Sequence, residues 1–295
     1  MRNRNFRQML EKKWGEGKFV SVGLDSDSEK IPRNEPPRAD GYGPRIIDVI
    51  VAFNRAIVEA TKDLVCAYKP NLAFYISHGA DGIDTLLRTI TDIRNIAPDV
   101  PVILDAKFAD IGNTNAGYVE FAFEYLGVDA ITVHPYLGRE ALQPFLDCKD
   151  KGVFVLCRTS NPGAGEFQDQ QVLNPIAHDR RDAFIPLYQY VAYRVAREWN
   201  KNGNCGLVVG ATYPNELCEV RGLVGDMPIL IPGVGAQGGD IEKTVKAGKD
   251  SRGQGMIINS SRGIIFASNG PDFADAARRA TLKLHTLINQ YRKEI

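Results

Sequence analysis

Short apolar segments alternate with longer amphipathic segments along almost the whole chain. The apolar segments predict eight β-strands, at residues 19–25, 64–70, 100–107, 130–135, 152–158, 206–212, 228–234 and 255–261. Apolar residues at helical spacing predict a helix after each strand, near 44–62, 80–97, 114–126, 138–150, 181–201, 214–222, 239–248 and 271–292. Strands this short and this apolar are typical of parallel strands that are buried on both faces.

Eight consecutive strand–helix units in 295 residues predict an α/β fold of the (β/α)8, or TIM-barrel, class. A doubly wound open sheet is the alternative that the same pattern allows. Phe6, Met9, Leu10 and Trp14 recur at helical spacing before the first strand, so we expect an extra N-terminal helix that packs on the barrel. We find no linker-like stretch and expect residues 1–295 to form one domain.

Two connections are long, at residues 26–43 and 159–180. Both follow a predicted strand, so both should lie at the rim formed by the carboxyl ends of the strands. Active sites of TIM barrels lie at that rim, and lids are built there.

Composition narrows the possible partners and the cellular location. The chain has 36 basic and 36 acidic residues, which gives no electrostatic case for binding nucleic acid or an anionic membrane surface. No segment approaches the length of an apolar membrane span. The five cysteines are widely spaced, without a CxxC pair, and three lie in apolar segments. We therefore expect buried, reduced thiols in a cytoplasmic protein.

Charged residues end the first three predicted strands. Asp25 ends the first, Lys69 the second, and Asp105 and Lys107 the third. Side chains two residues apart on a strand share a face, so Asp105 and Lys107 should point the same way. An ionic network that only stabilises the barrel is one interpretation. Pairing alone hardly recovers the cost of desolvating four charges, which favours a functional site.

Asp110 lies beyond the end of the third strand, in a turn before the helix that starts near Thr114. Two interpretations stay open for it. In one, it faces away from the interior of its own barrel. In the other, it is an acidic residue near the helix N-cap that the dipole of the following helix favours.

The seventh and eighth strands lead into a candidate phosphate site. "PGVGAQGG" (232–239) contains a GxGxxG pattern, but a Pro precedes it and no acidic residue ends the next strand, which disfavours a dinucleotide fold. A Gly-rich turn lets backbone N–H groups approach an anion, and Arg262 follows the eighth strand. Barrels commonly bind phosphate at these two loops, so a phosphorylated sugar would span the rim. The four histidines lack metal-ligand spacing, and no cofactor motif is present.

The segment "LDAKFADIGNT" (104–114) matches the D-x-K-x-x-D-I-x-x-T motif of the orotidine 5′-phosphate decarboxylase family. The resemblance extends in order through "GLD", "YKPN", "TSNPGA", "PGVGAQGG" and "SSRGI", and the chain is similar to the branch with larger bacterial members. The resemblance implies a TIM-barrel carboxy-lyase that needs no cofactor or metal. Its reaction would convert orotidine 5′-monophosphate to uridine 5′-monophosphate, the last step of de novo pyrimidine nucleotide synthesis.

The resemblance also implies roles for the charged rim. Asp25 and Lys69 would hold ribose hydroxyls, Asp105 would lie against the substrate carboxylate, and Lys107 would stabilise and protonate C6 of the pyrimidine. Asp110, Ile111 and Thr114 would reach the active site of the other subunit of a homodimer.

Further roles follow from the same resemblance for the loops after the fifth, seventh and eighth strands. Ser160 would contact the pyrimidine amide, and Gln237 would bridge the base and the phosphate. The residues around the phosphate would be Pro232, Gly235 and Arg262. Arg158 and residues 164–180 match no part of the motif.

Two alternatives remain. Metal-dependent sugar-phosphate lyases and decarboxylases of the same superfamily resemble the chain at D-x-K-x-x-D, but they place an acidic residue at the end of the second strand to hold Mg²⁺. This chain has Lys69 there, which would repel the metal. A non-catalytic protein that binds a phosphorylated ligand would leave Lys107 among the acidic residues without a purpose.

Overall fold

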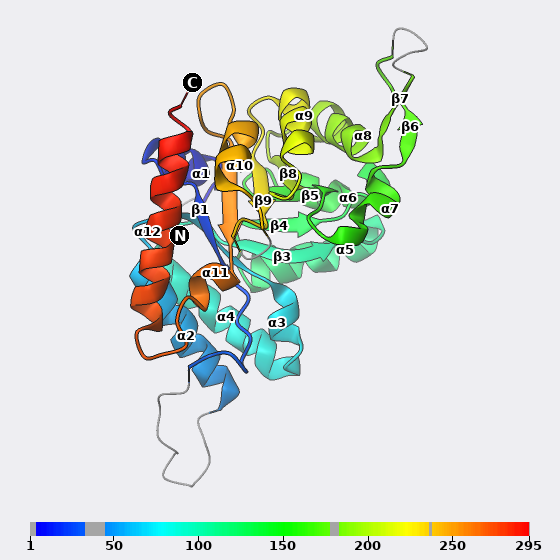
Figure 1. Ribbon diagram of the computed structural model, residues 1–295. Coiled ribbons are helices and arrows are strands. Elements are labelled where there is room, and N and C mark those ends of the chain that lie inside the picture. The colour runs from blue at the N-terminus through cyan, green and yellow to red at the C-terminus, as the bar shows by residue number, and fades with distance from the viewer. Residues whose placement is uncertain (1–3, 33–44, 178–182, 236–237, 295) are drawn as a thin grey trace.

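The computed structural model describes residues 4–32, 45–177, 183–235 and 238–294. Eight parallel strands form one sheet in the order β2-β1-β10-β9-β8-β5-β4-β3. Their bounds are β1 Val20–Leu24, β2 Val65–Pro70, β3 Ile103–Phe108, β4 Ala130–Val133, β5 Gly152–Arg158, β8 Cys205–Val209, β9 Ile229–Pro232 and β10 Met256–Ser260. Parallel bridges Tyr68–Val102 and Asn71–Asp105 connect β2 to β3 and close the barrel. The predicted (β/α)8 class is confirmed (Figure 1).

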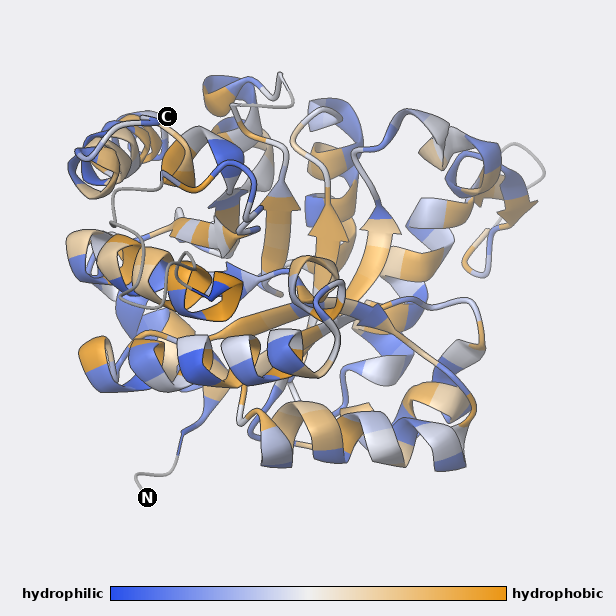
Figure 2. Cartoon of the chain, turned by 90° about the horizontal axis from the view of Figure 1, so that it is seen from below, coloured by the Kyte–Doolittle hydropathy of each residue, from blue (hydrophilic) through white to orange (hydrophobic). Residues whose placement is uncertain are grey.

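Helices surround the barrel, with apolar residues banded along them and concentrated in the strands (Figure 2). Their bounds are α1 Phe6–Gly15, α2 Ile46–Thr61, α3 Leu72–Ile76, α4 Gly79–Ile96, α5 Gly112–Val119, α6 Gly138–Leu146, α7 Gly165–Gln168, α8 Leu187–Arg194, α9 Pro214–Val224, α10 Ile241–Gly248, α11 Arg262–Ile265 and α12 Phe273–Tyr291. Single π-helical segments continue α5 at Glu120–Tyr125 and α8 at Val195–Trp199. Of the helices described here, none combines the length and apolar character that crossing a membrane requires.

The predicted N-terminal helix is α1. Asn5 caps it, because its side-chain oxygen accepts a hydrogen bond of 3.0 Å from the backbone N–H of Gln8. Phe6, Leu10 and Trp14 lie on its buried face, and the Trp14 indole N–H donates to the Met256 carbonyl at the start of β10 (2.8 Å). The helix therefore covers the end of the barrel at which the strands begin.

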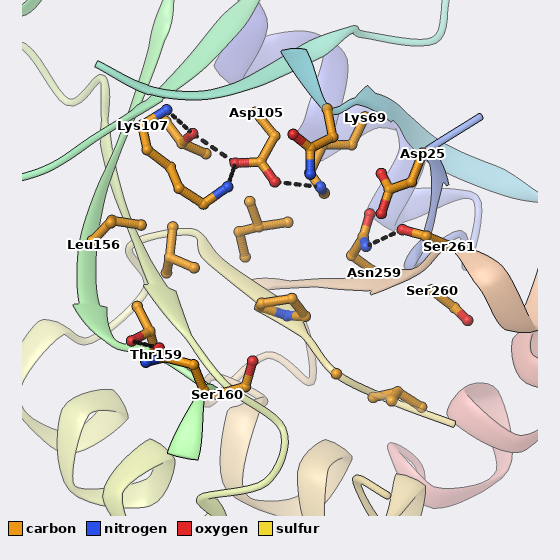
Figure 3. A pocket seen from close by; sticks show the side chains of 18 of the residues that line it. Asp25, Lys69, Asp105, Lys107, Leu156, Thr159, Ser160, Asn259, Ser260 and Ser261 are labelled. Atoms are coloured by element: carbon orange, nitrogen blue, oxygen red, sulfur yellow. Dashed lines mark hydrogen bonds and ion pairs between the residues drawn. The ribbon is translucent and has the colours of Figure 1, made fainter. Parts of the chain in front are cut away.

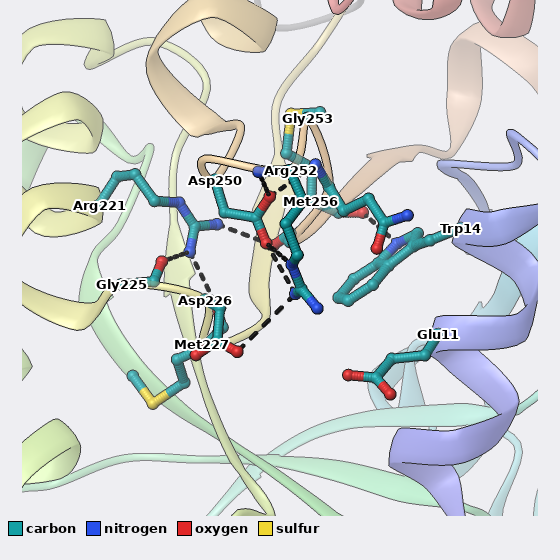
Figure 4. Close-up of polar contacts among 12 residues, drawn as sticks. Glu11, Trp14, Arg221, Gly225, Asp226, Met227, Asp250, Arg252, Gly253 and Met256 are labelled. Atoms are coloured by element: carbon teal, nitrogen blue, oxygen red, sulfur yellow. Dashed lines mark hydrogen bonds and ion pairs between the residues drawn. The ribbon is translucent and has the colours of Figure 1, made fainter.

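Arg221 of α9 stabilises the same end of the barrel (Figure 4). Its buried guanidinium donates hydrogen bonds of 2.7–2.8 Å to four backbone carbonyls, those of Gly225, Met227, Gly248 and Gly255. Burial lowers its pKa to about 10. Because Met227 lies two residues before β9 and Gly255 directly precedes β10, one side chain ties together the segments that lead into two neighbouring strands.

The connection 159–180 contains more structure than the sequence predicts, and the prediction of a helix from residue 181 is wrong at its start. After β5 come a 3₁₀ turn at Pro162–Ala164, helix α7, and an antiparallel hairpin of β6 (Gln171–Leu173) and β7 (Phe184–Pro186). Helix α8 begins only at Leu187, because Pro186 adopts an extended conformation (ψ 148°) and blocks helix continuation on its N-terminal side. In the other long connection, residues 33–44 lie outside the described residues.

The cysteines differ strongly in exposure. Cys66, Cys157 and Cys205 are buried, Cys148 is half-buried, and Cys218 is exposed. Burial raises the pKa of both the Cys157 and Cys205 thiols to about 12. We therefore expect the native protein to show one fast thiol, Cys218, in a titration with 5,5′-dithiobis(2-nitrobenzoate), and the others to react slowly or only after unfolding. Cys218→Ser should remove the fast phase; a second fast thiol in that variant would contradict the burial pattern.

Candidate functional site

A cavity of about 380 Å³ opens at the rim where the barrel strands end. Seven of the predicted site residues line it: Asp25, Lys69, Asp105, Lys107, Ser160, Pro232 and Arg262. Figure 3 shows the charged residues on one side of the cavity and the Thr159–Ser160 segment on the other. The predicted strand ends therefore converge on one pocket.

Asp105 is the centre of the charged cluster. Its Oδ2 lies 2.7 Å from the Lys69 ammonium, and its Oδ1 lies 2.6 Å from the Lys107 ammonium. The Thr132 hydroxyl also donates to Oδ1, at 2.9 Å. Burial alone would raise the pKa of Asp105, but Lys69 and Lys107 outweigh it and hold that pKa well below its usual range. The carboxylate is therefore ionised at neutral pH.

Lys69 is almost fully buried, with 3% of its surface exposed. Burial lowers its pKa, but the carboxylates of Asp105 and Asp25 outweigh that effect and raise the pKa above its ordinary value. Asp25 lies beside Lys69 in the pocket (Figure 3), and its buried Oδ1 has no hydrogen-bond partner within the described part of the chain. A buried acceptor of this kind is costly unless it is satisfied, so a ligand hydroxyl suits the position.

Lys107 has a strained backbone. Its φ is 54°, and no other non-glycine residue in the described ranges has a positive φ. The pairing of β3 with β4 shifts register between Leu104 and Phe108, and the Lys107 N–H donates to the Thr132 hydroxyl at 3.0 Å. Such irregularities re-aim side chains next to active sites. The predicted shared face of Asp105 and Lys107 thus arises through a distorted strand end, at a cost of about 1–3 kcal/mol.

The candidate phosphate end of the cavity combines the two predicted loops. Pro232 lines it from the end of β9, Gly233 and Val234 from the turn that follows, and Ser261 and Arg262 from the segment after β10. Gly233 and Gly235 have φ values of 100° and 81°, which glycine adopts readily. Gly235 itself is exposed and does not line the cavity, and Gln237 lies outside the described residues.

Close packing explains the glycine of "GLD" at strand β1. A Cβ on Gly23 would lie 1.9 Å from the Ser261 hydroxyl oxygen, so a larger residue would push the turn after β10 away from the pocket.

Asp110, Ile111 and Thr114 are not among the residues that line this cavity. The turn that contains Asp110 is fixed by Asn115, whose side chain accepts from the Asp110 N–H (2.9 Å) and donates to the Asp110 carbonyl (2.7 Å). The Asp110 carboxylate accepts only a local bond from the Ile111 N–H, at 2.6 Å, among the hydrogen bonds described. The chain thus holds these residues on the rim, beside their own pocket.

Sequence reasoning missed several polar residues that line the cavity, namely Asn71, Thr132, Thr159, Asn161, Gln168 and Asn259. Asn71, Thr159 and Asn161 lie inside the segments "YKPN" and "TSNPGA" that resemble the family, and Asn259 lies near the end of the predicted eighth strand, which are the signals that could have found them. Thr132 stands alone in an apolar strand, and Gln168 enters the pocket through the fold of its connection.

Comparisons with known proteins agree with the barrel fold, the charged cluster and the Gly-rich turn described above. A family model described as "Orotidine 5'-phosphate decarboxylase / HUMPS family" matches residues 19–277. The curated orotidine 5′-phosphate decarboxylase of Thermomicrobium roseum is 49% identical over 293 residues, covering 99% of this chain and 97% of that protein.

Solved structures give the same result. The OMP decarboxylase of Leishmania donovani has a TM-score of 0.81 and 35% identity, and covers 99% of this chain and 100% of its own. The Leishmania donovani UMP synthase has a TM-score of 0.82 and 38% identity; the match covers 98% of this chain and 56% of that longer one. This chain belongs to the orotidine 5′-phosphate decarboxylase/HUMPS family.

Proposed function

We propose that this chain decarboxylates orotidine 5′-monophosphate to uridine 5′-monophosphate, the last step of de novo pyrimidine nucleotide synthesis. One observation carries the proposal beyond family membership: the ionised Asp105, with only 12% of its side chain exposed, lies between the ammonium groups of Lys69 and Lys107. Lys107 stands at the mouth of the pocket, with 47% of its side chain exposed, within reach of a bound base.

The chemistry requires a group that stabilises a carbanion. When the C6–carboxylate bond breaks, CO₂ leaves and the electron pair stays on C6 of the pyrimidine. The Lys107 ammonium stabilises that pair electrostatically and then transfers a proton to C6, after which solvent reprotonates the amine. Asp105 beside the departing carboxylate adds repulsion that CO₂ loss relieves.

The size of the Asp105 repulsion can be compared with the total barrier reduction that catalysis requires. Two unit charges about 4 Å apart at an effective dielectric constant near 20 interact by roughly 4 kcal/mol. Enzymes typically lower reaction barriers by about 8–23 kcal/mol. Repulsion by Asp105 is therefore the smaller term. Stabilisation by Lys107, together with water exclusion when phosphate and base binding closes the loops, supplies the larger share.

The other residues that line or flank the cavity can be assigned to the ribose, the phosphate and the base of the substrate. The unpartnered Oδ1 of Asp25 suits a ribose hydroxyl, with Lys69 beside it. We propose that Arg262, Pro232 and Gly235 surround the phosphate. Ser160, at the opposite side, would contact the pyrimidine amide. We also propose that Gln237 bridges base and phosphate.

We also propose a homodimer in which Asp110, Ile111 and Thr114 complete the partner's site. Support comes from the position of these residues off their own cavity and from exposed apolar side chains nearby. Ile111 is 56% exposed and Tyr136 is 87% exposed, on the adjoining turns that lead into α5 and α6. Exposed apolar surface of this kind favours an interface between subunits.

We further propose that the protein is located in the cytoplasm, because its cysteines are free thiols, which persist in a reducing compartment.

Lys69 separates this proposal from the metal-dependent alternative. That alternative needs an acidic residue at the end of the second strand, and here a cation ion-pairs with Asp105 at that point. A single absorbance experiment distinguishes the candidates. Orotidine 5′-monophosphate should lose its ultraviolet band when the protein is added, at the same rate with and without EDTA. Turnover that EDTA abolishes would select the metal-dependent lyase, and binding without turnover would select a binding protein.

A further inference from the structure

Arg158, the last residue of β5, has no role in the motif and yet is almost fully buried, with 3% of its surface exposed. Its Nε and Nη2 lie 3.0 and 3.1 Å from the two carboxylate oxygens of Asp169. Its guanidinium lies over the Tyr213 ring, 3.8 Å from the ring centroid. Only Nη2 of the two makes a hydrogen bond to Asp169, but the planar guanidinium faces the carboxylate and stacks on the ring at once, which Lys cannot reproduce.

Arg158 and Asp169 hold the end of α7 against the turn that follows β5. Arg158 Nη1 donates to the Thr159 carbonyl (3.2 Å) and lies 3.5 Å from the Gln168 amide oxygen. Asp169 directly follows Gln168. Gly165 has no side chain. A Cβ there would lie 2.4 Å from an Asp169 carboxylate oxygen, so glycine at this position leaves room for the carboxylate.

Both the oxygen and the nitrogen of the Gln168 side-chain amide form hydrogen bonds with Thr159. The Gln168 Oε1 accepts from the Thr159 N–H at 2.8 Å, and the Gln168 Nε2 donates to the Thr159 hydroxyl at 2.9 Å. The Thr159 hydroxyl in turn donates to the Asn161 side chain at 2.7 Å. Gln168, Thr159 and Asn161 all line the cavity. The amide therefore fixes the segment on either side of Ser160.

The opposite side of Ser160 is equally confined. A Cβ on Gly210 would lie 2.7 Å from the Ser160 Cβ and 2.8 Å from its Cα. The Gly210 N–H donates to the Arg158 carbonyl at 2.7 Å. Ser160 is thus enclosed between the chain after β8 and the Gln168 contacts.

We propose that Gln168, held by the Arg158–Asp169 pair, is a positioning residue that sets Ser160 for recognition of the pyrimidine base. The inference rests on the proposed function and gives residues 164–169 of the long connection a part in it. Because Gln168 acts through Thr159 on the base side of the pocket, its loss should weaken binding of the base and leave the ribose phosphate side unaffected. A general structural role would affect both sides together.

Gln168→Leu tests this proposal, with Gln170→Leu as the matched control. Gln170 is exposed, lies two residues further along, and its side chain donates to the Glu166 carbonyl, without contact to Thr159 among the hydrogen bonds described. Binding of uridine 5′-monophosphate and of ribose 5-phosphate is measured by calorimetry, together with kcat and KM. We expect Gln168→Leu to weaken nucleotide binding roughly tenfold and to change ribose 5-phosphate binding less than about twofold, with Gln170→Leu like the parent.

Equal weakening of both ligands, or no weakening of either, would overturn the inference. Arg158→Lys is a second variant that keeps the charge, and it should weaken nucleotide binding selectively in the same way, because it loses the planar guanidinium that faces Asp169 and stacks on Tyr213. The melting temperature and elution volume of each variant show whether fold and assembly are retained. The binding measurements do not depend on turnover, so a parent protein that fails to decarboxylate would reject the proposed function separately.

Discussion

Lys107→Ala should lower kcat by roughly 10⁴-fold or more, since it removes both the cation that stabilises the carbanion and the proton donor, and each such contribution is typically worth about 10²–10⁴. Binding of uridine 5′-monophosphate should change only a few-fold, because the proposed phosphate and ribose contacts remain. Asp105 keeps its ion pair with Lys69 at 2.7 Å, so the buried carboxylate retains a counter-charge and the barrel should fold.

The measurement is decarboxylation followed by absorbance at saturating substrate, with product binding by calorimetry. Lys246→Ala is the control, since Lys246 is an exposed lysine of α10 that pairs with Glu242 of the same helix and with Glu294 near the C-terminus. Turnover of Lys107→Ala within about tenfold of the parent would remove Lys107 from the proposed role.

Mixing Asp110→Ala with Lys107→Ala should restore activity that neither variant has alone. In a homodimer whose sites each take Lys107 from one subunit and Asp110 from the other, a mixed dimer contains one intact site and one site that lacks both residues. Random exchange makes half of the dimers mixed, so activity should recover to about a quarter of the parent value. The recovery is large because it starts from nearly zero.

Subunit exchange must be shown independently, for example by co-purification through a tag on one variant only. Asp84→Ala mixed with Lys107→Ala is a suitable control, because Asp84 is an exposed acidic residue of α4 whose carboxylate lies 3.9 Å from the Arg88 guanidinium and does not line the cavity. No recovery after verified exchange would mean that Asp110 serves its own barrel or only the start of α5.

The barrel was predictable because eight apolar segments each supply a strand that is buried on both faces, a pattern that few other folds require. The charged cluster was predictable because Lys69, Asp105 and Lys107 are costly at strand ends and therefore conspicuous. The backbone conformation of Lys107 was not predictable. A lysine in the sequence gives no sign of a positive φ, which here accompanies the register shift of β3 against β4.

Other features depend on how the long connection after β5 folds on itself. Gln168 meets Thr159 only because α7 folds back over β5, and the short β6–β7 hairpin has too few residues to show a strand pattern. The assignment of residues 1–295 to one domain, and the role of Gln237, stay predictions.

The positive φ of Lys107 sets heat tolerance against activity at one position. Glycine would relieve the strain there, so Lys107→Gly should melt at a higher temperature than Lys107→Ala. A laboratory selection that rewards thermal endurance alone would therefore tolerate or even enrich a catalytically dead chain, and any engineering of this barrel should screen both properties in the same round.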